Sequence, residues 1–197
     1  MVVAVCAAVG ANGSERPDCF VEWIGATCGG RQYINTGYVF KSIPRVEAHA
    51  RRTDGGDCDQ AGTPYAFFNV NYAGGGIYYR CGSSGDTWVG RSGTSVTVPL
   101  NTWTDYVWST NVIHNGVEVG YSSIWQSAAD NFANNTQVFY LFAGRNQGGI
   151  DFGHVRMYDG DSPVPVRDYY PARKDGVYGF YDMQNDKFYK NAGNGEF

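Results

Sequence analysis

The sequence contains few charged residues and very little lysine. Asp, Glu, Lys and Arg together make up 17% of the 197 residues, whereas disordered chains and long solvent-exposed helices carry more charge. Residues 122–134 are the one place where a helix would fit, and they carry no sustained apolar stripe at the helical period. Disorder and an α-helical architecture are therefore both disfavoured.

Runs of basic residues are also missing, apart from the pair Arg51 and Arg52. The formal net charge is −4, and the sequence pI is about 5.3. A protein that binds nucleic acid draws most of its affinity from Lys and Arg side chains that neutralise phosphates. We therefore expect no nucleic-acid partner.

The chain has no apolar run long enough to span a bilayer, which takes about 20 residues. Residues 1–10 are apolar and small, and they resemble the end of a secretory signal, although the usual basic start is lacking. We interpret residues 1–17 as a signal remnant or a disordered N-terminus and residues 18–197 as one domain. The expected location is extracellular or the cell surface.

The five cysteines form no C-x-x-C pair, so neither a zinc knuckle nor a redox motif is indicated. Cys6 belongs to the apolar N-terminal stretch, and the remaining four cysteines allow three pairings. Proximity along the chain favours the disulfides Cys19–Cys28 and Cys58–Cys81. The alternative is that these cysteines are buried free thiols.

Aromatic residues, by contrast, reach 16%, and the chain has 27 glycines. Rings and β-branched residues suit the pleated surface of a sheet, and glycines suit the turns between short strands. Residues 45–51 alternate cleanly, with Val46, Ala48 and Ala50 on one face and charged residues and a histidine on the other. The composition and this alternation favour an all-β fold.

Several strand pairs can be predicted from their turns. A glycine-rich turn at 72–76 joins two aromatic runs, and Asn115–Gly116 joins two alternating runs, which is the strongest short-range hairpin signal. Residues 176–182 and 187–190 form a predicted closing hairpin. In the strand over 102–109 we assign Trp103 to the core. Many short strands at this spacing predict a two-sheet antiparallel sandwich.

Four separated segments resemble laminin-G-like domains. Residues 100–119 carry a Trp that opens one strand and an Asn–Gly turn, and residues 138–158 resemble the last core strands of that family. Residues 166–193 and the opening strand at 33–37 look like a bacterial surface-protein subgroup. The resemblance covers about residues 20–197. It implies a jelly roll of the concanavalin A-like type, a fold that hosts lectins, adhesion modules and glucanases alike.

The sequence gives little sign of catalysis. Glucanases of that fold carry paired carboxylates in an E-x-D-x-x-E pattern, and no Glu here has an Asp two residues later. Glu47 is the nearest candidate, but its neighbours on the strand face are Arg45 and His49. His49, His114 and His154 stand on different predicted strands or turns without a metal or nucleophile motif. We therefore expect a protein that is not an enzyme.

Calcium is the candidate metal, and no other cofactor is indicated. Asp54, Asp57 and Asp59 lie in one short glycine-containing loop, and calcium prefers several oxygen ligands around one point. Laminin-G-like domains often carry calcium at a sheet edge, so the resemblance points the same way. The alternative is an ordinary acidic turn, because three carboxylates fall short of the six or more oxygens that calcium takes.

The expected function is that of a non-catalytic extracellular binding module with a carbohydrate ligand. The candidate ligand-binding residues are exposed rings and a polar loop that follows a strand: Tyr78, Tyr79, Trp88, Trp125, Arg145, Asn146 and Gln147. Most rings in an aromatic-rich sandwich pack in the core, and that is the alternative for these. A structural or adhesion module that contacts a surface protein within a larger assembly is the second hypothesis, and a glycoside hydrolase is the third.

Overall fold

The computed structural model describes residues 15–26, 32–53, 65–72, 75–81, 86–89, 96–97, 99–121, 132–142, 149–194 and 196–197. For the strands between residues 65 and 97, and for Tyr121, it describes the backbone only. Within these ranges the chain is almost entirely strand and turn, and Phe132 and Ala133 alone have helical backbone. The prediction of an all-β fold is confirmed.

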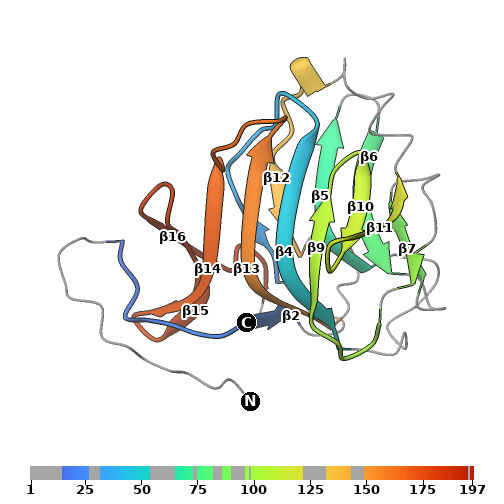
Figure 1. Cartoon of the computed structure of the whole chain (residues 1–197). Coiled ribbons are helices and arrows are strands. Elements are labelled where there is room, and N and C mark those ends of the chain that lie inside the picture. Colours follow the sequence, from blue (N-terminus) through green and yellow to red (C-terminus); the bar gives the residue numbers. More distant parts are fainter. Residues whose placement is uncertain are drawn as a thin grey trace.

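The strands form two sheets, and all their pairings are antiparallel. The larger sheet has ten strands (Figure 1). Its main path, in spatial order, is β11 (Val117–Tyr121), β10 (Asn111–His114), β9 (Thr104–Trp108), β4 (Pro44–Arg52), β13 (Ile150–Asp159), β14 (Arg167–Lys174), β15 (Val177–Asp182) and β16 (Lys187–Lys190).

Two short N-terminal strands complete the larger sheet. Strand β1 (Cys19–Phe20) pairs with β14, and β2 (Ile24–Ala26) pairs with β13. Strands β13 and β14 pair only where Val155–Met157 lies beside Arg167–Tyr169. Beyond that point they separate, and β1 and β2 lie between them. We call this separation of β13 and β14 the fork.

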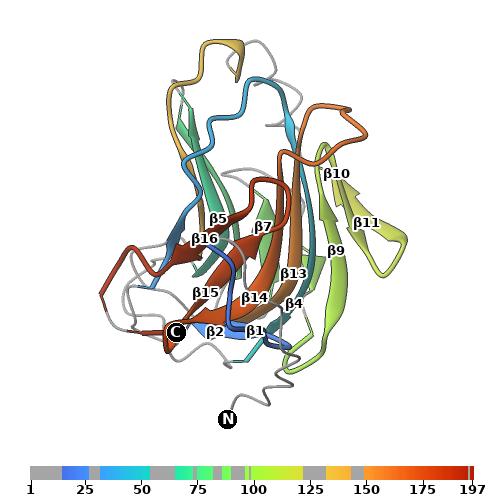
Figure 2. The ribbon, with the colours of Figure 1, turned by 90° about the vertical axis from the view of Figure 1, so that its left-hand side faces the viewer.

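The smaller sheet has six strands, in the order β3 (Ile34–Asn35), β12 (Phe139–Leu141), β5 (Tyr65–Tyr72), β6 (Gly75–Cys81), β7 (Asp86–Val89) and β8 (Val96–Thr97). Figure 2 shows the two sheets on opposite sides of the molecule. Side chains of both sheets belong to one buried cluster, which includes Ile34 and Leu141 from one sheet and Val46 and Phe152 from the other. The architecture is therefore that of a β-sandwich.

The hairpins predicted from turn residues are confirmed. Asn115 and Gly116 have φ angles of 48° and 81°, the positive values that a two-residue turn needs at both positions. Strands β5 and β6 pair as far as Tyr72 and Gly75, and the closing hairpin is β15 with β16. Strand β15 also pairs with β14, so the closing hairpin continues the ten-stranded sheet.

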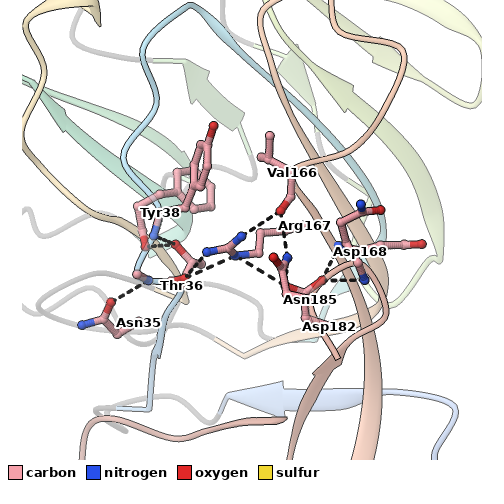
Figure 3. Close-up of polar contacts among 11 residues, drawn as sticks. Asn35, Thr36, Tyr38, Val166, Arg167, Asp168, Asp182 and Asn185 are labelled. Carbon is pink, nitrogen blue, oxygen red and sulfur yellow. Dashed lines mark hydrogen bonds and ion pairs between the residues drawn. The ribbon is translucent and has the colours of Figure 1, made fainter. Parts of the chain in front are cut away.

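A polar network ties the sheets together between β14, β15 and the segment after β3 (Figure 3). The Arg167 guanidinium donates to the Thr36 carbonyl at 3.2 Å and lies 3.5 Å from the Asp182 carboxylate, which is completely buried. The same guanidinium lies 5.1 Å from the ring centroid of Tyr38. Burial and the hydrogen bond to Asp159 raise the pKa of Tyr38 to about 12. This buried network stabilises the packing of β14 and β15 against the segment after β3.

Candidate functional site

The outward face of β4 carries the polar residues that its alternation predicted. Val46, Ala48 and Ala50 are buried, and between them Glu47 is half-buried and His49 exposed. Successive side chains of a strand point to opposite faces. Because the even-numbered residues of β4 are buried, its odd-numbered residues point to solvent. This outward face is the base of the candidate site.

Trp103 lies on this outer face, so its assignment to the core is wrong. Its ring stacks on the imidazole of His49, with centroids 4.7 Å apart and planes 5° apart. The core side of β9 is taken instead by Thr104, Tyr106 and Trp108. Successive side chains of a strand point to opposite faces, so a strand in a sandwich buries one of two sets of residues. In β9 the set with two large rings is buried, and the set with Asp105 faces water.

The Arg51 guanidinium lies between two indole rings at one end of the site. Its centre is 5.0 Å from the ring centroid of Trp23 and 4.8 Å from that of Trp103. The same guanidinium forms an ion pair of 2.7 Å with Asp151, whose pKa is raised by burial and lowered in part by Arg51. A Cβ atom on Gly25 would lie 2.1 Å from the Asp151 carboxylate, so the ion pair needs a glycine there.

A β-bulge at the fork directs His154 to the same face. The register between β13 and β4 shifts between Phe152 and Val155, and such bulges re-aim side chains. The His154 imidazole forms a short contact with the Asp168 carboxylate and stacks on Tyr170 at a centroid distance of 4.2 Å. Arg156 reaches the same carboxylate at 3.3 Å.

A shallow groove of about 220 Å³ lies on the outer face of the larger sheet. The residues that line it are Glu47, Ala48, His49, Asp105, Tyr106, Val107, His154 and Arg156. A histidine–aspartate pair stands on each side, since His49 lies 2.6 Å from Asp105 and His154 contacts Asp168. The groove thus offers hydrogen-bond donors and acceptors at close range.

Glu47 at the groove already has partners. Its carboxylate lies 3.4 Å from the Arg45 guanidinium and accepts a hydrogen bond of 3.2 Å from the hydroxyl of Tyr158. None of the described lining residues is a Ser, Cys or Lys, the usual covalent nucleophiles besides carboxylates. The arrangement suits recognition of a polar ligand by hydrogen bonds.

The structure brings three of the predicted ligand-binding residues to neighbouring strands of the smaller sheet. Tyr78 and Tyr79 belong to β6 and Trp88 to β7, where Trp88 is in register with Arg80. Trp125, Arg145, Asn146 and Gln147 lie outside the described residues. The predicted surface on β6 and β7 and the groove on β4, β9 and β13 therefore belong to different sheets.

The predicted calcium ligands Asp54, Asp57 and Asp59 also lie outside the described residues. In the part of the chain that is described, no three His, Cys, Asp or Glu side chains are grouped as metal ligands. The disulfide predictions stay predictions. Cys19 is buried, with 1% of its surface exposed, whereas Cys28 and Cys58 lie outside the described residues and Cys81 is described by its backbone in β6.

Sequence reasoning missed the groove because its residues are far apart along the chain. The sequence places His49 and His154 on different strands or turns, and the pairing of β4 with β13 brings them together. The one local signal in the sequence was a glycine inside a strand pattern, Gly153, directly before His154. In the structure, a Cβ atom on Gly153 would lie 3.3 Å from the His49 ring. Such a close approach is typical of a bulge next to a site.

Two further findings bear on identity. The described residues contain no helix long and apolar enough to cross a membrane. No family model, no curated protein and no solved structure matches this chain.

Proposed function

We propose that this protein is a non-catalytic extracellular module that binds carbohydrate in the groove on its ten-stranded sheet. The observation that carries the proposal is the groove itself, with carboxylates, a guanidinium and two imidazoles around about 220 Å³. A sugar ring presents several hydroxyl groups, each of which donates and accepts hydrogen bonds. Mixed donors and acceptors within one small groove suit such a ligand.

The proposal includes a jelly roll of the laminin-G-like type. Its support is that strands distant in sequence lie side by side in both sheets, β4 beside β13 and β3 beside β12. Such pairings are typical of Greek-key and jelly-roll sandwiches. Secretion to the cell surface, as part of a larger assembly, belongs to the same proposal.

We propose a non-catalytic module because the carboxylates near the groove already contact neighbouring side chains. Glycoside hydrolysis needs one carboxylic acid that carries a proton toward the scissile bond and a second carboxylate across from it. At the groove, Glu47 contacts Arg45 and Asp105 contacts His49. Asp168, which does not line the groove, contacts the lining residue Arg156. These carboxylates are directed at neighbours in the sheet, an arrangement that favours binding over hydrolysis.

A glycan array with the purified protein tests the proposal. We expect binding to glycans, strong loss of binding in Glu47→Gln and His49→Ala, and unchanged binding in Glu118→Gln. Glu118 is a matched control because it is exposed on the far edge strand β11, where it accepts a hydrogen bond from Asn111. A fourth variant, Trp88→Ala, reports on the smaller sheet.

Three outcomes would overturn the proposal in different ways. Loss of binding in Trp88→Ala but not in the groove variants would move the ligand to the smaller sheet. No glycan binding, with a surface protein captured instead, would support the adhesion hypothesis. Release of reducing ends from a glycan by the pure protein, abolished by Glu47→Gln, would make the protein a glycoside hydrolase.

A further inference from the structure

The charged side chains around the groove stand in pairs, and this pairing bears on the charge of the ligand. Arg156 lies 3.3 Å from Asp168, and Glu47 lies 3.4 Å from the guanidinium of Arg45. Asp105, the other carboxylate that lines the groove, pairs with His49. Among the residues that line the groove, the two carboxylates of Glu47 and Asp105 therefore exceed the one guanidinium, that of Arg156.

An acidic ligand would meet that excess directly. The Asp105 carboxylate is the most open of these groups, with 76% of its side chain exposed, so it would repel a carboxylate or sulfate that enters the groove. The Arg156 side chain is 41% exposed, but an anion that approached it would have to compete with Asp168, which is already in place. An anion therefore cannot form an ion pair with Arg156 unless the existing pair with Asp168 is weakened.

A neutral sugar meets no such conflict. A carboxylate has about four acceptor positions and a guanidinium has five N–H donors, so groups that already hold one partner can still bind a hydroxyl. The two aromatic contacts, His49 on Trp103 and His154 on Tyr170, fix the imidazoles on either side of the groove. The site is thus ordered for hydrogen bonds to neutral hydroxyl groups.

We propose that the groove selects neutral glycans and excludes acidic ones such as uronates, sialosides and sulfated sugars. This inference rests on the proposed carbohydrate function and adds the chemical class of the ligand. The residue that sets the selectivity is Asp168, because it occupies the guanidinium of Arg156 and contacts His154.

The test is a glycan array at pH 7.5 that presents neutral, carboxylated and sulfated glycans, followed by titration with matched probes. Fully methyl-esterified and de-esterified oligogalacturonides share one backbone and differ in charge. For the native protein we expect signals from neutral glycans and none from acidic ones. The variant Asp168→Asn releases Arg156 and should gain affinity for acidic glycans by about two- to fivefold, the change that one partly exposed ion pair supplies.

Two variants keep the test decisive. Asp161→Asn changes the net charge of the protein equally at an exposed turn between β13 and β14, and it should gain nothing. Asp105→Asn gives a second route to the same gain if Asp168→Asn does not fold by circular dichroism. Preferential binding of acidic glycans by the native protein, or an equal gain in Asp161→Asn, would overturn the inference while leaving carbohydrate binding intact. Absence of any glycan binding would overturn the proposed function and the inference together.

Discussion

Removal of the Arg167 guanidinium is expected to destabilise this protein strongly. The variant Arg167→Met keeps much of the apolar stem but leaves the Asp182 carboxylate, which is 0% exposed, without its ion pair. The buried carbonyl of Thr36 also loses its donors, which lie at 3.2 and 3.4 Å. A buried charge without its partner cannot recover hydration as long as the fold persists.

The size of the effect follows from this burial. Removing one partner of a buried ion pair costs about 3–5 kcal/mol. The backbone N–H groups of Asp168 and Gln184 and the amide of Asn185 still donate to Asp182, so we expect a value near the lower end of that range. For a chain of this size, a loss of about 3 kcal/mol corresponds to a decrease in Tm of roughly 6–12 °C.

Urea unfolding followed by tryptophan fluorescence measures this cost, and Arg156→Met is the matched control. Arg156 pairs with Asp168 from the opposite face of the sheet, where its side chain is 41% exposed, so its loss should cost about 1 kcal/mol or less. Adding Asp182→Asn to Arg167→Met should restore part of the stability, because it removes the unpaired charge. If the two arginine variants differ by less than about 1 kcal/mol, the buried ion pair does not stabilise the fold as argued.

Two further predictions concern packing and pH. Gly179→Ala should lower the unfolding free energy by about 1–3 kcal/mol in urea titrations, because the added Cβ would lie 2.3 Å from the Tyr189 carbonyl oxygen. Val177→Ala, at an exposed position, should change the unfolding free energy little. Equal stability of the two variants would contradict the packing argument. Burial lowers the pKa of His114 from 6.5, so the unfolded chain takes up a proton there before the folded protein does, and stability should fall as the pH drops through 6.5 toward the lowered pKa. In His114→Gln this decrease should be smaller, and an NMR titration that placed the His114 pKa above 6.5 would refute the sign.

Strand positions and turns were predictable from sequence because their signals are local. The alternation in β4 identified which residues face the core, and Asn115–Gly116 identified the β10–β11 turn from its positive φ angles. The prediction that Trp103 faces the core was wrong, because alternation does not say which of the two faces of a strand is buried. Either set of residues in β9 could have been buried, and the choice fell to the set with Tyr106 and Trp108 because it fills more of the space between the sheets.

The sequence by itself determined the all-β class, the period-two faces of the strands and the positions of the hairpins. Only the tertiary structure decided that β4 lies between β9 and β13 and that β1 and β2 fill the fork. That order places His49 beside His154 and Glu47 in register with Arg156. The physical reason is that backbone pairing between distant strands depends on how the whole apolar surface is buried, and no local pattern encodes the partner of a strand.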